Sequence, residues 1–169
     1  ESPKKGGKYA PYRQSERRDI YDRYTEQILK TDYAYIAFDT AEELDAIRAE
    51  YEAKGDVFSY DNKTRNRLRN SLALSEEEVQ KLLDAKTPYV VRFKMPVDRI
   101  LNLEDIIRGK SSVNTNTLDD KVLVKNDGMP TYHFANVVDD FEMKISHVIR
   151  GEEWLPSMPL HVLLYEAMS

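Results

Sequence analysis

Apolar side chains recur at a spacing of three to four residues in the first part of the chain, a pattern typical of an amphipathic helix. Ile20, Tyr24 and Ile28 are four residues apart and would share one helix face. Ser15 precedes them and is a candidate N-cap, because its hydroxyl can accept a hydrogen bond from a free amide of the first turn. The pattern therefore predicts a helix that begins after Ser15 and reaches Leu29.

Two further helices are predicted from the signals at their starts. Thr40 is followed three residues later by Glu43, and Ser75 is followed in the same way by Glu78. In such a capping box the hydroxyl accepts from the amide three residues on, while the carboxylate accepts from the amide of the hydroxyl residue. Gly55 is expected to end the first of these helices.

Runs of β-branched and aromatic residues bounded by turn residues predict the strands. These runs are 33–38, 89–94, 100–107, 121–126, 131–138 and 146–150. Asp127 and Gly128 form a turn dipeptide that predicts a hairpin, whereas the polar stretch 111–117 predicts a loop. An apolar helix is expected over 160–168. Because strands and helices alternate in the last part, as in βαβ units, the sequence predicts an α/β or α+β chain.

The composition is that of a globular protein and excludes several kinds of site. The 169 residues are 41% hydrophobic and 33% charged, and the length fits one domain or two small ones. Because there is no Cys, disulfides, thiolate zinc sites and a Cys nucleophile are excluded. No apolar run reaches the ~20 residues that cross a bilayer, so no membrane partner is expected. The net charge of -5 restricts nucleic-acid contact to local patches.

Arg150 is the first candidate for binding chemistry. It ends a predicted strand and precedes Gly151, and open α/β sheets bind ligands beyond the carboxyl ends of their strands. A guanidinium there offers a planar fork that matches a carboxylate or a phosphate. The alternative is an ordinary ion pair with Glu152 or Asp139, of the kind that contributes little when exposed. Spacing alone leaves both interpretations open.

Two long runs carry a resemblance to a known family. They are DGMPTYHFANVVDD at 127–140 and ISHVIRGEEWLPSMPLHVLLY at 145–165, and YRQSER at 12–17, VRFKMP at 91–96 and LDDKVLV at 118–124 agree upstream. Together they cover nearly the whole chain, in order. The sequence resembles the bacterial glutamyl-tRNA synthetases, which are class I aminoacyl-tRNA synthetases.

The resemblance implies a glutamate pocket. The matching positions are Tyr132, His133, Phe134, Ala135, Asn136 and Arg150. Tyr132 and Arg150 match the residues that hold the side-chain carboxylate of substrate glutamate, and Asn136 matches a substrate-contacting amide. Glutamine would leave the Arg150 guanidinium unpaired, so the site would favour glutamate. Glu153 matches an ATP contact. No catalytic side chain is expected, since the substrate carboxylate itself attacks ATP and the protein supplies positioning and charge stabilisation.

The fold that the resemblance implies is part of a Rossmann-type nucleotide-binding fold carrying an α+β insertion that binds the tRNA acceptor end. Residues 1–32 would be the end of the first Rossmann half, 33–130 the insertion, and 131–169 the start of the second half. The implied function is that of a cytoplasmic, monomeric glutamate–tRNA ligase, which activates L-glutamate with ATP and Mg²⁺ and transfers it to tRNA(Glu).

The family's two ATP signatures, His-Ile-Gly-His and Lys-Met-Ser-Lys, do not occur in this sequence. The chain is therefore expected to be an internal piece that is inactive alone. Two alternatives stay open: a non-catalytic module that binds tRNA or glutamate, and a truncated glutamyl-transferring paralogue.

No metal is expected. Many relatives bind zinc at four positions that match Ala37, Asp39, Thr64 and Asn66. Only Asp39 could ligate zinc, and one carboxylate does not make a tetrahedral site. The three histidines, which are expected to be structural or to line the substrate pocket, are His133, His147 and His161.

The best basic cluster for tRNA is the stretch 62–70. Arg65 and Arg69 are expected on one helical face, where they would contact phosphates. The alternative is a solvated helix face with no partner.

Overall fold

The computed structural model describes residues 2–169. In chain order its main elements are α1 Arg18–Leu29, β1 Ala34–Ala37, α2 Ala41–Ala53, α3 Glu76–Asp84, β2 Val90–Phe93, β3 Ile100–Asp105, β4 Gly109–Asn114, β5 Val122–Val124, α4 Tyr132–Glu142 and α5 Met158–Met168. Four short 3₁₀ turns accompany them: Gln14–Glu16, Arg65–Arg67, Thr115–Thr117 and Glu152–Ser157. The mixed α/β class predicted from the sequence is confirmed.

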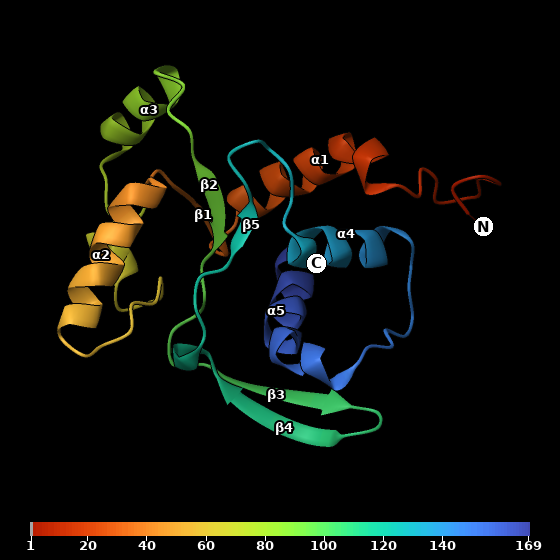
Figure 1. Cartoon of the computed structure of the whole chain (residues 1–169). Coiled ribbons are helices and arrows are strands. Elements are labelled where there is room, and N and C mark those ends of the chain that lie inside the picture. Colours follow the sequence, from red (N-terminus) through yellow and green to blue (C-terminus); the bar gives the residue numbers. More distant parts are fainter. Residues whose placement is uncertain (1) are drawn as a thin grey trace.

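A three-stranded antiparallel sheet, in the order β1-β2-β5, has helices on both faces (Figure 1). The pairing of β1 with β2 runs from Ala34 opposite Phe93 to Ala37 opposite Val90. Because side chains alternate along a strand, Ala34 packs into the core shared with α1, α4 and α5, whereas Tyr35 packs into a second, smaller core beside α2. The sheet thus separates two apolar clusters.

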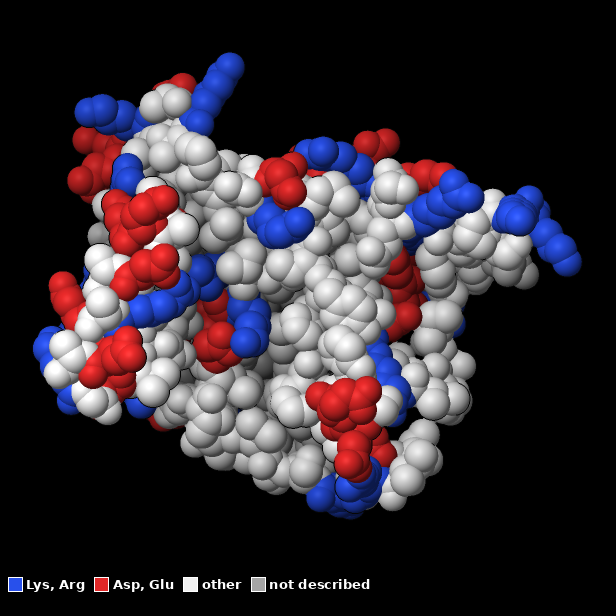
Figure 2. Space-filling view, viewed as in Figure 1, with Lys and Arg blue, Asp and Glu red and all other residues white. Residues whose placement is uncertain are grey.

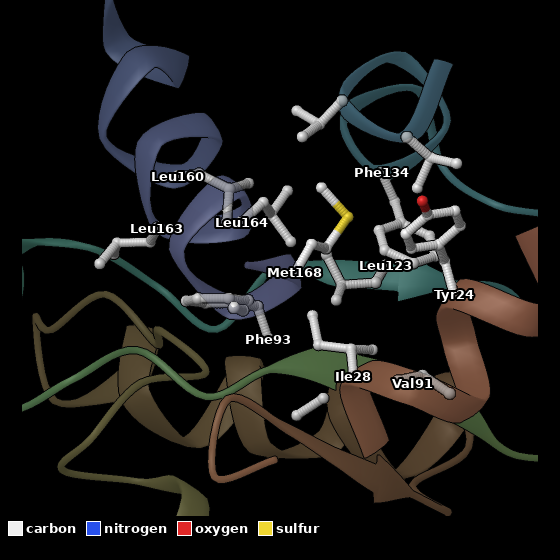
Figure 3. Packing of buried hydrophobic residues seen from close by; sticks show 14 of the residues in the cluster. Tyr24, Ile28, Val91, Phe93, Leu123, Phe134, Leu160, Leu163, Leu164 and Met168 are labelled. Carbon is white, nitrogen blue, oxygen red and sulfur yellow. The ribbon is translucent and has the colours of Figure 1, made fainter. Parts of the chain in front are cut away.

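The larger core joins the two ends of the chain to its middle. Figure 3 shows Ile28 of α1, Phe93 of β2 and Leu123 of β5 packed against the last two helices. Phe134 of α4 and Leu163 of α5 complete the contact, and both are fully buried. The three regions expected from the sequence therefore share one core, and the boundaries between them stay a prediction.

The helix starts of α2 and α3 are confirmed. Thr40 accepts from the Glu43 amide at 3.2 Å, and the Glu43 carboxylate accepts from the Thr40 amide at 2.8 Å. Ser75 and Glu78 form the same reciprocal pair. Gly55 follows the end of α2 with a φ of 77°, a conformation that glycine adopts without steric cost.

Removing one capping box should measurably destabilise the protein. Thr40→Ala removes the acceptor for the Glu43 amide, and we expect a loss of about 1 kcal/mol in the free energy of unfolding, measured by urea denaturation. Glu42→Ala, in the same first turn but outside the box, is the matched control and should cost only a few tenths of a kcal/mol. Equal losses for both variants would contradict a capping role for Thr40.

The predicted N-cap of the first helix is wrong. Ser15 lies in a 3₁₀ turn, and α1 begins at Arg18 after Arg17, which makes no side-chain capping bond. The buried Arg17 side chain instead donates to the Asp139 carboxylate at 2.7 Å and to the Pro11 carbonyl oxygen at 2.7 Å. Tertiary contacts of Arg17, rather than a local cap, therefore fix the start of this helix.

The predicted loop 111–117 is a strand over most of its length. β4 pairs with β3 from Ile100 opposite Asn114 to Asp105 opposite Gly109. Its residues are mostly exposed, so polar side chains are tolerated, and the pairing with β3 outweighs their low strand propensity. Leu101 and Leu103 of β3 are buried in the main core and anchor the hairpin.

The predicted strand 131–138 is the helix α4. The turn at Asp127 and Gly128 is present, but the chain beyond it makes only one isolated bridge, between Val124 and Pro130, before the helix begins. Phe134, Val137 and Val138 are spaced by three and one residues and are all buried. That spacing fits the helical period of 3.6 residues. The strand had been predicted instead from the aromatic and β-branched residues of the run.

The predicted strand 146–150 is not a strand. Within residues 2–169 no strand pairs with it, and an extended segment needs a neighbour to satisfy its backbone amides and carbonyls. Its Ile149 side chain is 93% exposed.

None of the helices that the structure describes combines the length and the apolar character needed to cross a membrane.

Candidate functional site

A cavity of about 500 Å³ lies beside α4 and α5, closed on one side by the tip of the β3–β4 hairpin. The connection between α4 and α5, which Figure 1 shows as a long loop, completes its wall. Polar and aromatic side chains on this wall include Arg108, Asp140, Arg150, Trp154, His161 and Tyr165. Charged and apolar groups therefore converge in one space large enough for a small ligand.

Arg150 reaches this cavity from the loop, and its side chain is only 17% exposed. Nη2 donates to the Asn136 Oδ1 atom, and Nη1 lies 3.3 Å from the His161 Nδ1 atom. The Asp140 carboxylate lies 3.7 Å from Nη2, outside hydrogen-bonding distance. The guanidinium is thus hydrogen-bonded to two neutral groups and forms a longer, partly buried ion pair with Asp140.

The ion pairs considered for Arg150 from the sequence are not formed. Asp139 accepts from Arg17 and from the Tyr21 hydroxyl, and Glu152 pairs with Arg108. Both carboxylates are therefore engaged elsewhere, so the alternative of an exposed pair with Glu152 or Asp139 is wrong. The ion pair that Arg150 does form is with Asp140, and it is mostly buried.

Aromatic rings stand next to Arg150. The Tyr132 ring centroid is 5.8 Å from the Arg150 guanidinium carbon and 4.8 Å from the Trp154 ring centroid. Tyr132 opens α4 and is exposed. These contacts bring Tyr132, Asn136 and Arg150 together, as predicted.

Two predicted pocket residues, Phe134 and Ala135, face away from the site. Both are buried in the main core between α1, α4 and α5, as Figure 3 shows for Phe134. Because α4 is a helix, positions four residues apart share a face, and Tyr132, Asn136 and Asp140 form the row on the open side. The prediction that Phe134 and Ala135 line the pocket is therefore wrong.

His133 and His161 contact one another, whereas His147 lies apart and contacts Ser146 at 3.1 Å. The His133 Nδ1 and His161 Nε2 atoms are 3.0 Å apart. Burial, together with the charge of Arg150, lowers the pKa of His161 to about 4 and also lowers that of His133. Both imidazoles are therefore neutral at pH 7.

Asp140 and Trp154 are site residues that sequence reasoning missed, and for His161 it gave only a structural or pocket-lining role, without the contact to Arg150. The spacing of Asp140 from Asn136, four residues on a helix, could have identified it once α4 was recognised. Burial raises the pKa of the Asp140 carboxyl. The sequence around Trp154 and His161 does not indicate that either residue lies near Arg150, because tertiary packing alone brings them there.

Glu153, the predicted ATP contact, lies in the exposed 3₁₀ turn Glu152–Ser157. Its carboxylate folds back against Gly151, which has no Cβ to obstruct it. Glu153 therefore stands at the edge of the site, next to residues of the cavity wall.

Arg65 cannot contact tRNA phosphates as predicted. Its side chain is buried, Nη1 donates to the Asp120 carboxylate at 3.0 and 3.2 Å, and Nη2 donates to the Met95 carbonyl oxygen at 3.0 Å. The expected helical face shared with Arg69 does not exist, because the 3₁₀ turn covers only Arg65–Arg67 and Leu68 after it is extended. The prediction for Arg65 is therefore wrong.

Arg69 remains accessible. Its Nη1 atom lies 3.7 Å from the Glu43 carboxylate, and both side chains are substantially exposed. Figure 2 shows positive and negative side chains interspersed over α2 and α3 rather than gathered into one positive patch. Contact with tRNA through Arg69 stays a prediction.

The four positions expected to lack zinc lie near the smaller core. Both Asp39 oxygens accept hydrogen bonds, one from the Arg69 amide and one from the Tyr60 hydroxyl, each at 2.8 Å. Thr64 donates to the Ser59 carbonyl oxygen at 2.6 Å. Among residues 2–169 there is no group of three or more potential ligands that could hold a metal ion. The absence of zinc stays a prediction.

Known proteins resemble the chain over almost its whole length. Residues 3–169 match a family described as "tRNA synthetases class I (E and Q), catalytic domain". The glutamate–tRNA ligase of Christiangramia forsetii is 57% identical over 167 residues, which are 99% of this chain and 33% of that protein. The ligase of Flavobacterium johnsoniae is 58% identical over 163 residues, 96% of this chain and 32% of that protein.

Solved structures agree in fold and sequence. A crystal structure of a glutamate tRNA ligase from Elizabethkingia meningosepticum in complex with its amino acid is 84% identical, with a TM-score of 0.98. A glutamate-tRNA synthetase from Elizabethkingia anophelis is also 84% identical, with a TM-score of 0.97. Each match covers 99% of this chain and 34% of the other. The chain thus spans about a third of the length of the relatives that it matches.

Proposed function

The chain belongs to the catalytic domain of the class I tRNA synthetases for glutamate and glutamine, and on that premise we propose that it serves a glutamate–tRNA ligase. The reaction joins L-glutamate to the AMP part of ATP with release of pyrophosphate and then transfers the glutamyl group to the 3′ end of tRNA(Glu) with release of AMP. The cytoplasm is the proposed location, and a monomer the proposed state.

The observation that carries the choice of glutamate is the bonding of Arg150. Its guanidinium is mostly buried, and its hydrogen-bond partners are the neutral Asn136 and His161. A positive charge in that setting gains most from an anionic ligand, and a carboxylate matches the planar fork. In our proposal the side-chain carboxylate of glutamate binds Arg150 and accepts from the Tyr132 hydroxyl, while Asn136 contacts the same substrate.

The residues present supply binding rather than covalent chemistry. The α-carboxylate of bound glutamate attacks the α-phosphate of ATP, and the bond from that phosphate to pyrophosphate breaks. Holding the two substrates in line contributes to the rate without a protein nucleophile. Glu153 is the proposed ATP contact in this part of the chain, and Mg²⁺ would accompany the nucleotide.

The proposed domain organisation follows the family. Residues 1–32 and 131–169 would belong to the two halves of a Rossmann fold, and 33–130 to the insertion that receives the tRNA acceptor end. Arg69 is the proposed phosphate contact within the insertion, since its guanidinium is accessible and that of Arg65 is not. A zinc site has no place in this proposal.

The test is glutamate-dependent exchange of pyrophosphate into ATP, measured on the protein encoded by the complete reading frame. We expect exchange with glutamate to exceed exchange with glutamine by at least about 10²-fold, because glutamine leaves Arg150 unpaired. Attachment of glutamate to tRNA(Glu) should follow. Glutamate binding without exchange would identify a non-catalytic module, and exchange without charging of tRNA(Glu) would identify a glutamyl-transferring paralogue; either result contradicts the proposal.

A further inference from the structure

Three side chains from different elements form a continuous hydrogen-bonded row at the edge of the cavity. Arg150 comes from the loop between α4 and α5, His161 from the second turn of α5, and His133 from the first turn of α4. The Arg150 Nη1 atom lies 3.3 Å from His161 Nδ1, and His161 Nε2 lies 3.0 Å from His133 Nδ1. Residues 133, 150 and 161 are thus connected only through the folded structure.

The chemistry of these groups allows one arrangement of protons. A guanidinium only donates hydrogen bonds and keeps its charge, so the His161 Nδ1 atom must be the acceptor. An imidazole with a free Nδ1 is neutral and carries its proton on Nε2. That proton is then donated to His133 Nδ1, which leaves the His133 proton on Nε2. Burial, which lowers the pKa of both rings, favours the same neutral states.

We propose that His161 is a positioning residue for Arg150: its neutral ring, held in place by His133, accepts from Nη1 and fixes the plane of the guanidinium toward the substrate carboxylate. The inference rests on the proposed function, because it assumes that Arg150 binds the side chain of glutamate. It assigns a specific role to a residue that was expected from the sequence only to be structural or to line the substrate pocket.

Neutral acceptors suit this task better than a carboxylate would. An acidic partner in hydrogen-bonding contact would orient Arg150 and would also neutralise the charge that recognises the substrate. His161 and the Asn136 amide orient two nitrogens of the guanidinium without adding negative charge. Among the residues that the structure describes, Asp140 is the only carboxylate within 4.0 Å of Arg150; it forms an ion pair at 3.7 Å without a direct hydrogen bond, so the orientation of the guanidinium is fixed by the two neutral acceptors.

Two substitutions distinguish a positioning role of His161 from a role in packing alone. Asparagine places an oxygen where His161 has Nδ1, so His161→Asn keeps an acceptor for Arg150, whereas His161→Leu fills similar space with none. In the complete ligase we expect His161→Leu to raise the KM for glutamate by about 10-fold or more, since a hydrogen bond to a charged group is lost. The kcat and the KM for ATP should change by less than about 3-fold. His161→Asn should recover most of the glutamate KM.

An unchanged glutamate KM in His161→Leu would overturn the inference, and so would equal effects of His161→Leu and His161→Asn. If His161→Leu does not fold, nitrogen-15 NMR of histidine-labelled wild-type protein decides, with the His161 signals assigned from the His161→Asn variant. A neutral ring protonated on Nε2 at pH 7 supports the inference, and a protonated Nδ1 overturns it. Absence of glutamate-dependent exchange in the wild-type ligase would instead refute the proposed function, so the two failures are distinguishable.

Discussion

Replacing Arg150 by glutamine is expected to lower kcat/KM for glutamate by about 10²-fold or more, because truncating one partner of a buried, hydrogen-bonded charge pair costs about 2–5 kcal/mol. The Arg150 side chain is 17% exposed and is held by Asn136 and His161. The glutamate carboxylate would lose its cation in the variant. Glutamate-dependent pyrophosphate exchange on the complete ligase is the measurement.

The selectivity of the variant is more diagnostic than its rate. Arg150→Gln should reduce the preference for glutamate over glutamine, since the site no longer holds a charge that glutamine fails to satisfy. The preference of Arg150→Lys for glutamate over glutamine should lie between those of Arg150→Gln and the wild type, because lysine keeps the charge but lacks the planar fork. Arg48→Gln, on the exposed face of α2, is the matched control and should change neither kcat/KM for glutamate nor the preference for glutamate over glutamine. An unaltered preference in Arg150→Gln would refute glutamate recognition by Arg150.

The parts of the fold that could be predicted from sequence are those fixed by local interactions. Both capping boxes formed as expected, because each is closed by residues only three positions apart. Predictions failed where pairing or packing between distant residues decides. β4 is a strand because β3 lies beside it, and Arg17 rather than Ser15 precedes α1 because Asp139 binds its guanidinium.

The candidate site divides in the same way. Tyr132, Asn136 and Arg150 were predicted through family resemblance, and the structure brings them together. The resemblance also placed Phe134 in the pocket, whereas the helical period of α4 turns its side chain into the core. His161 could not be predicted as a partner of Arg150, since nothing in the separation of residues 150 and 161 indicates that a loop returns to α5.

The largest effect on stability is expected from Asp120, the centre of a buried polar network. Its side chain is fully buried, and its carboxylate accepts from Arg65 at 3.0 and 3.2 Å. The Tyr35 hydroxyl, at 2.7 Å, and the Met95 amide, at 2.9 Å, donate to the same group. Four hydrogen bonds therefore converge on one carboxylate and join β1, the segment that follows β2 and the Arg65 turn.

Asp120→Ala should lower the free energy of unfolding by about 3–5 kcal/mol, because it leaves the Arg65 guanidinium buried without its counter-charge. The urea concentration at the midpoint of unfolding should be lower for the variant than for the wild-type protein. Asp119→Ala is the matched control. Asp119 forms an exposed ion pair with Lys121, and its substitution should change stability by less than about 0.5 kcal/mol. Arg65→Gln tests the same network from the other side. It should destabilise the protein strongly, whereas a variant of native stability with weakened tRNA binding would return Arg65 to the role of a phosphate contact.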